Sequence, residues 1–292
     1  MNRRDAITKV GLAGLSATVA SIAASASSAE PGAPTQGRTV DPTLPPRPGS
    51  HPKHDMRGYG IPLVRQRVAM LVYPGMTALD LIGPHQILSK MGNVDIDFVW
   101  KTVDPVLTDG DFTLKPTLSF ADCPDNLTVL FVPGGLTGAA AMMTDAAVLE
   151  FLVRKARTAK YVASVCTGSL ILGAAGLLRG YKATSHWMTR DLLAALGARS
   201  VKARVVVDRN RVTGAGVTAC LDFALQLVTL LRNEKMAKAL QLANEYDPQP
   251  LFRSGKPETA PAAVTQMEWA MNNPSRDEIL DAVTQVRKRR KS

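Results

Sequence analysis

Short runs of apolar residues recur along the chain, with helix-like segments between them. Residues 68–73, 127–132 and 162–165 are almost continuously apolar, and the first two runs end at Pro74-Gly75 and Pro133-Gly134-Gly135. Such runs are typical of strands that are covered on both faces, as in parallel sheets. Strands that alternate with helices form right-handed β-α-β units. We therefore expect a doubly wound α/β fold with a mostly parallel central sheet.

Further segments continue the same alternation. Residues 96–101 are expected to form a strand, residues 145–158 a helix, and residues 217–231 a long apolar helix. Residues 204–207 and 211–213 flank an Asp-Arg-Asn turn and indicate a hairpin. The pattern runs without a linker over residues 67–265, so we expect one α/β domain there.

The two ends of the chain do not fit this pattern. Residues 1–29 combine Arg3-Arg4, a short apolar stretch and small residues, which predicts a twin-arginine signal peptide and a periplasmic or secreted protein. Residues 30–66 are rich in Pro and Gly and are expected to form a flexible linker. Residues 266–292 are expected to form a C-terminal extension of one or two helices with a basic tail. No other membrane segment is evident.

The net charge of +10 is concentrated at the ends of the chain. Residues 1–67 carry nine Lys and Arg against four Asp and Glu, and residues 287–291 are all basic. The intervening residues 68–286 carry equal numbers of acidic and basic side chains. The body of the protein therefore has no bulk electrostatic attraction for phosphate backbones, and we expect no nucleic-acid partner.

The chain has three cysteines, Cys123, Cys166 and Cys220. Their odd number and long spacings argue against a disulfide framework despite the predicted export. No Cys or His cluster has zinc-ligand spacing, so we expect no metal.

Cys166 ends the apolar run 162–165, and a helix-like segment over 169–178 follows it. A thiol at such a strand-to-helix turn lies beside the unpaired N–H groups and positive dipole end of the helix, which favour the nucleophilic thiolate. The alternative is a buried structural cysteine, as most free cysteines are.

Two other strand ends carry candidate site residues, because ligands of open α/β sheets bind outside the carboxyl ends of the strands. Asp80 lies in an otherwise apolar stretch, where a carboxylate needs a partner or a task; it could equally be a first-turn or N-cap acid. Gly134 and Gly135 could bring backbone N–H donors close to a ligand, or form a plain turn. His186 and His85 are more simply explained as structural residues.

Taken together, four segments resemble the ThiJ/PfpI family, and within it the isonitrile (isocyanide) hydratase branch. They are Leu-Asp-Leu-Ile-Gly-Pro from residue 79, Pro-Gly-Gly from 133, Cys-Thr-Gly-Ser-Leu-Ile-Leu-Gly from 166 and Lys-Ala-Thr-Ser-His-Trp from 182. The resemblance implies a flavodoxin-like sandwich, a homodimer and a cysteine on a nucleophile elbow. It also implies that Cys166 is the nucleophile, Thr167 the residue after the elbow and Asp80 the acid, with Gly134 and Gly135 lining the pocket.

The resemblance further implies a small-molecule substrate and no cofactor. Cys166 would add to the terminal carbon of an isonitrile while Asp80 supplies a proton, giving a thioimidate that water converts to an N-substituted formamide. Protease- and deglycase-type members have a glutamate where this chain has Asp80, and the protease-like members have a histidine where it has Thr167. Both departures count against peptidase and glyoxalase-type activity.

Two alternatives remain open. The first is a redox- or aldehyde-stress protein that uses the same cysteine, in the manner of glyoxalase- or deglycase-like members. The second is the ligand-sensing domain of an AraC-type regulator, which carries a similar Cys-Thr-Gly and His-Trp pattern. Such a regulator needs a helix-turn-helix module after the sensing domain, and only about 30 residues follow Pro261.

Overall fold

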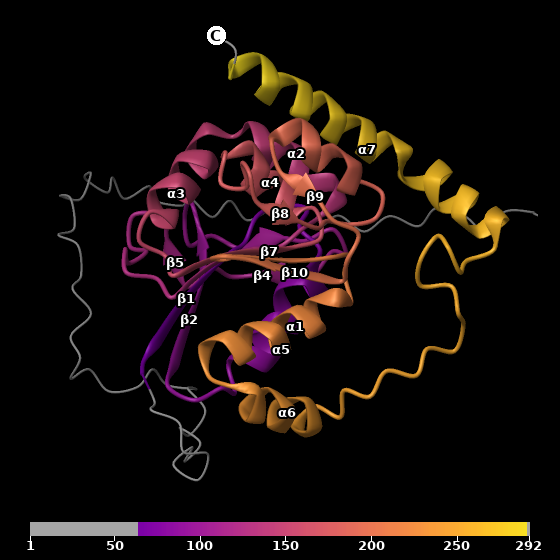
Figure 1. Ribbon diagram of the computed structural model, residues 1–292. Coiled ribbons are helices and arrows are strands. Elements are labelled where there is room, and N and C mark those ends of the chain that lie inside the picture. Colours follow the sequence, from indigo (N-terminus) through magenta and orange to yellow (C-terminus); the bar gives the residue numbers. More distant parts are fainter. Residues whose placement is uncertain (1–63, 291–292) are drawn as a thin grey trace, which may run out of the picture. The chain divides into compact units, whose positions relative to one another are not determined.

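A seven-stranded sheet forms the centre of the computed structural model, which describes residues 64–290 (Figure 1). All neighbouring strands of this sheet pair in parallel except one antiparallel pair at the edge. In spatial order the strands are β10 (Val205–Asp208), β11 (Arg211–Gly214), β7 (Tyr161–Val165), β6 (Val129–Val132), β1 (Gln66–Leu71), β2 (Val94–Trp100) and β5 (Leu118–Ser119). The predicted mostly parallel α/β fold is thus confirmed, and so is the hairpin, formed by β10 and β11.

Helices cover both faces of the sheet (Figure 1). One layer consists of α1 (Ala78–Leu88), α5 (Ala219–Leu231) and α6 (Glu234–Ala243). The other consists of α2 (Leu136–Thr144), α3 (Ala146–Ala156) and α4 (Gly168–Ala174). The 3₁₀ helix η2 (Arg190–Leu196) packs on α4, and α7 (Ala262–Arg289) packs on the outside of α2 and η2. Two small pairs lie outside the main sheet, β3 (Val106–Leu107) with β4 (Thr113–Leu114) and β8 (Lys182–Ala183) with β9 (Arg199–Ser200).

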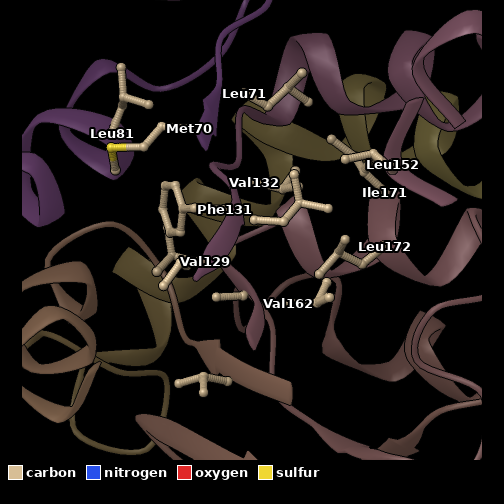
Figure 2. Close-up of a cluster of buried hydrophobic side chains, with 14 of the residues drawn as sticks. Met70, Leu71, Leu81, Val129, Phe131, Val132, Leu152, Val162, Ile171 and Leu172 are labelled. Atoms are coloured by element: carbon tan, nitrogen blue, oxygen red, sulfur yellow. The ribbon is translucent and has the colours of Figure 1, made fainter. Parts of the chain in front are cut away.

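The central strands are apolar because both of their faces are buried. Figure 2 shows the two sides at β6: Phe131 points toward the side of Leu81 of α1, whereas Val132 points toward Ile171 of α4. Consecutive residues of a strand alternate between faces, so an uninterrupted apolar run supplies both layers of the core at once.

This architecture brings four turns to one edge of the sheet. β1, β6, β7 and β11 are adjacent parallel strands, and each leads from its carboxyl end toward the helix that follows it, α1, α2, α4 and α5 respectively. The predicted site residues follow β1, β6 and β7 and are therefore neighbours, although Asp80 and Thr167 are 87 residues apart in the sequence.

The C-terminal segment differs from the expectation in detail. Residues 262–289 form one helix, α7, which contains Pro274 and packs on α2 and η2, so the expected domain boundary at residue 265 falls inside a helix. From the predicted basic tail, the Arg290 guanidinium donates to the carbonyls of Gly173, Ala174 and Leu196. The predicted signal peptide, and all but the last residues of the predicted linker, lie outside the described residues.

Two negative findings apply to residues 64–290. No single helix in this range is long and apolar enough to cross a membrane; one bent pair, α2 with α3, passes the test by length and composition only, as core helices of soluble proteins also do. The same range contains no group of three or more His, Cys, Asp or Glu side chains that could hold a metal ion.

Candidate active site

The three predicted site side chains meet around the backbone of Gly134, in the turn after β6. A Cβ atom placed on Gly134 would lie 2.6 Å from Cβ of Cys166, 2.6 Å from the backbone nitrogen of Thr167 and 2.7 Å from Oδ2 of Asp80. Real Cβ atoms do not approach other heavy atoms that closely, so only glycine can occupy this position without moving its neighbours. The geometry thus brings Cys166, Thr167 and Asp80 into one buried cluster.

Cys166 lies on a strained turn between β7 and α4. Its φ angle is 53°, in the left-handed region that a residue with a side chain seldom adopts. The surrounding structure holds it there: the Cys166 N–H donates to the carbonyls of Gly214 and Ala215, at 3.1 and 3.0 Å. Its carbonyl accepts from the Ser169 and Ser185 hydroxyls, both at 3.0 Å. Strain that is over-determined in this way is typical of a functional position and gives the turn its elbow form.

Asp80 is fully buried at the start of α1. Its Oδ2 accepts a 2.9 Å hydrogen bond from the Gly134 N–H, while Oδ1 accepts no hydrogen bond of normal geometry within the described range 64–290. Burial raises the pKa of Asp80 from 3.8 to about 7, against the opposing effects of the Gly134 N–H and the neighbouring Cys166 thiol. A carboxyl group with a free lone pair and a pKa near neutrality is suited to accept and return a proton.

A close helix contact places Asp80 in this position. α1 packs on α5 at Gly83, where a Cβ atom would lie 2.4 Å from Sγ of Cys220. The Asp80 N–H donates to the Thr77 carbonyl at 3.1 Å, and the Thr77 N–H donates to the Gly134 carbonyl at 2.9 Å. In the Leu-Asp-Leu-Ile-Gly-Pro motif the glycine therefore allows the close packing of α1 on α5, and the aspartate reaches the turn at Gly134.

The protonation of Cys166 differs from the expectation. The start of a helix was expected to favour the thiolate, but the side chain is 4% exposed, and burial followed by the charge of Asp80 raises the pKa of the thiol well above its usual range. The backbone N–H groups of Val217 and Thr167 act in the opposite direction without overcoming these effects. α4 has only seven residues. The resting site consequently holds a neutral thiol beside a carboxyl group.

Thr167 links the elbow to the turn after β6. Its Oγ1 accepts a 2.9 Å hydrogen bond from the Gly135 N–H, and Thr167 is fully buried. The two N–H groups that were predicted to face a substrate thus bond to site side chains, that of Gly134 to Asp80 and that of Gly135 to Thr167. Their role as donors to a substrate stays a prediction.

The structure adds residues that sequence reasoning did not place in the site. Val217 directs its N–H to the sulfur from a backbone with φ of 27°, and the preceding Gly-Ala-Gly was the only hint of an unusual turn. Tyr73 is buried beside the cluster, but it ends an apolar run and looks like core in the sequence. His186 packs on Gly216; burial lowers its pKa to about 4, so its imidazole is neutral.

Comparison with known proteins settles the family. The DJ-1/PfpI family matches residues 66–230, which is more than half of the chain. The chain belongs to the DJ-1/PfpI family. An isonitrile hydratase from Pseudomonas putida is 48% identical over 198 residues, covering 68% of this chain and 86% of that protein. The predicted resemblance to the ThiJ/PfpI family and its isonitrile hydratase branch is thereby confirmed.

Solved structures and more distant relatives agree with this placement. The crystal structure of a ThiJ/PfpI family protein from Pseudomonas syringae superposes with a TM-score of 0.74 at 47% identity, covering 82% of this chain and 98% of that one. A deglycase from Thermococcus kodakarensis is 30% identical over 168 residues, covering 57% of this chain and 99% of the deglycase. The family therefore includes proteins of different activity, so the activity of a member has to be inferred from its site residues.

The close contacts of Gly134 give a direct test of the cluster. Gly134→Ala should lower the free energy of unfolding by about 2–3 kcal/mol and disturb the Cys166–Asp80 pair, because the new methyl group overlaps three fixed groups. Urea unfolding and the rate of Cys166 alkylation by iodoacetamide measure the two effects. Gly110→Ala is the matched control, since a Cβ there meets nothing within 4 Å. Equal stability and equal alkylation of both variants would show that the turns are not packed as described.

Proposed function

We propose that the protein is an isonitrile hydratase, a hydro-lyase that adds water to an isonitrile to give an N-substituted formamide. The observation that carries the proposal is the 48% identity to an isonitrile hydratase over 86% of that protein's length. The arrangement of Cys166 and Asp80 around Gly134 supports it, because the reaction needs one nucleophile and one group that moves protons.

In the first step the Cys166 sulfur attacks the terminal carbon of R–N≡C. Asp80, as the carboxylate, accepts the thiol proton during the attack and returns it to the same carbon. One C–S bond and one C–H bond form, and the product is the thioimidate R–N=CH–S–Cys166. The N–H groups of Val217 and Thr167 stabilise negative charge on the sulfur while it attacks.

In the second step water replaces the sulfur. Asp80, again ionised, takes one proton from the water as the water oxygen adds to the thioimidate carbon, and it passes this proton to the nitrogen. The tetrahedral carbon then expels the sulfur, which receives the proton of the new hydroxyl group, and R–NH–CHO is released. The sum is one isonitrile and one water for one formamide, with Cys166 and Asp80 returned to their starting states.

Two substitutions test this scheme with cyclohexyl isocyanide as substrate and formamide formation as the readout. Cys166→Ala should give no product, whereas Cys123→Ala, which removes another buried thiol, should retain the wild-type rate. Asp80→Asn should lose about 10²–10⁴-fold in kcat. Wild-type activity should fall as the pH drops through about 7, because Asp80 must be ionised to accept the proton. An unchanged rate in Asp80→Asn would remove the proton-transfer role.

The same preparation distinguishes the main alternative function, which the deglycase relative favours. Consumption of methylglyoxal without hydration of the isocyanide would overturn the proposed activity in favour of aldehyde chemistry. The residues count against that outcome. The family resemblance implies a glutamate in place of Asp80 in protease- and deglycase-type members, and a histidine in place of Thr167 in protease-like members.

We also propose that the protein forms a homodimer through the segment that joins α6 to α7. Residues 244–261 contain no helix or strand and follow a long path between these helices (Figure 1). Two adjacent large apolar side chains on it are exposed, Leu251 at 86% and Phe252 at 72%. The segment is held near both ends, by the Tyr246 hydroxyl on Asp222 and by an ion pair between Glu258 and Lys202, so its apolar part is presented outward.

Light scattering after size exclusion tests the homodimer. The wild-type protein should have twice the mass of one chain, and Phe252→Asp should shift it toward the monomer, because a charge would then be buried at the interface. Phe112→Asp is the control, since Phe112 is 49% exposed on the separate β3–β4 turn. A monomeric wild-type protein, or an unchanged mass in Phe252→Asp, would contradict the proposal.

Export by the twin-arginine route remains a proposal that rests on the sequence of residues 1–29. Replacing Arg3 and Arg4 together with lysine keeps the charge and removes the paired arginines that the export machinery recognises. We expect fractionation of bacterial cells to find the wild-type protein outside the cytoplasm and the double variant within it. Equal distribution of both would contradict export by this route.

A further inference from the structure

The peptide group between Pro133 and Gly134 is hydrogen-bonded at both of its ends. Its carbonyl oxygen accepts a 3.0 Å hydrogen bond from the Tyr73 hydroxyl, and its N–H donates at 2.9 Å to Oδ2 of Asp80. The peptide unit is planar, so the direction of the carbonyl determines the direction of the N–H. A donor on the carbonyl also polarises the peptide and strengthens its N–H as a donor. Tyr73 and Asp80 are thus connected through one rigid group.

The next peptide group is held in the same manner. The Gly134 carbonyl accepts from the Thr77 N–H at 2.9 Å, and the Gly135 N–H donates to Thr167 Oγ1 at 2.9 Å. Two successive peptides therefore support the two site residues Asp80 and Thr167. The donor to the second is a backbone group, whereas the donor to the first is a side chain, so its contribution can be removed by substitution.

Tyr73 combines this hydrogen bond with core packing. Its side chain is fully buried, two residues after the end of β1. The Pro133 carbonyl that it holds is crowded as well, since a Cβ atom on Gly168 would lie 2.6 Å from its oxygen. A buried carbonyl without a donor is costly, so the Pro133 peptide depends on the Tyr73 hydroxyl for its orientation.

We propose that Tyr73 is a positioning residue for Asp80: its hydroxyl fixes and polarises the Pro133–Gly134 peptide, whose N–H holds the carboxyl group that moves the proton. The role of Asp80 in this statement rests on the isonitrile hydratase activity proposed above. Tyr73 itself touches neither water nor substrate in the scheme and acts through the peptide alone.

Several titratable groups face Asp80, so the effect of Tyr73 on the pKa of Asp80 must be distinguished from the effects of the others. They are Tyr73 after β1, Cys166 after β7, Asp109 in the β3–β4 turn and Cys220 on α5. Burial and then the charges of Asp80, Cys166 and Asp109 raise the pKa of Tyr73 well above its usual range, so the phenol remains a neutral donor. Removing its hydroxyl leaves every charge in place and weakens only the Gly134 N–H that stabilises the Asp80 carboxylate.

Tyr73→Phe tests the proposal through the pH dependence of kcat. The acid limb of the profile should move upward by about half a pH unit, because the carboxylate loses part of its stabilisation. At pH 7 kcat should fall by about twofold, because the ionised fraction of Asp80 falls by that factor, with KM changed less. Tyr246→Phe is the matched control, since it removes a hydroxyl that bonds to Asp222 on α5 and should leave the profile in place. A purely structural role would lower the stability of Tyr73→Phe without moving the limb.

A second readout does not depend on turnover. The charge on Asp80 disfavours the Cys166 thiolate, so the rate of Cys166 alkylation by iodoacetamide reports the titration of Asp80 as well. In the pH profile of the alkylation rate, the step at low pH that reports Asp80 should move to higher pH in Tyr73→Phe. If the wild-type protein fails to hydrate cyclohexyl isocyanide, the proposed function fails, and the alkylation profile still decides the role of Tyr73.

Site-specific incorporation of 3-fluorotyrosine at position 73 gives the opposite perturbation and covers the case in which Tyr73→Phe does not fold. The fluorinated phenol is more acidic and hence a stronger donor, so the step should move to lower pH than in the wild type. Opposite shifts in the two variants support the proposal. A step that stays at the wild-type pH in the fluorotyrosine protein, or in a folded Tyr73→Phe, would overturn it.

Discussion

The backbone of Gly134 lies against Cys166, Thr167 and Asp80 at distances that a residue with a side chain could not keep. Three turns that follow different strands can converge because this one position takes up almost no space. Once they converge, the Gly134 N–H reaches the Asp80 carboxyl and the Gly135 N–H reaches the Thr167 hydroxyl. The carboxyl ends of the parallel strands bring the turns to a common edge, and the absence of a side chain at Gly134 lets Cys166, Thr167 and Asp80 come together there.

The fold could be predicted largely from the sequence, because parallel strands covered on both faces leave unbroken apolar runs. The runs that contain Phe131 and Val132, or Val162 and Val165, could hardly be anything other than central strands. Residues 190–196 form a 3₁₀ helix rather than an α-helix. Its pattern of apolar residues does not distinguish the two helix types over so short a length.

The site could be predicted in part. Cys166 and Asp80 could be found because a thiol at a strand end and an acid in an apolar stretch both stand out by composition. Tyr73 and Val217 could not, since one acts through a buried hydroxyl and the other through its backbone N–H. The protonation state of the Cys166 thiol also could not be predicted from the sequence. It depends on how completely Cys166 is buried, and a sequence does not show the depth at which a turn lies.

The burial of Asp80 has a consequence for the folded protein as a whole. Its pKa is about 7 in the folded state and 3.8 in an unconstrained chain, so the folded state binds this proton more tightly than the unfolded state does. The stabilisation from that proton is complete below pH 3.8, declines as the pH rises and is gone above about pH 7. For a fully buried group the difference is on the order of 4 kcal/mol, a sizeable fraction of the net stability of a typical domain. The ionised carboxylate that the chemistry requires is therefore the form that folding disfavours, and the rest of the core must supply the stability that the site gives up.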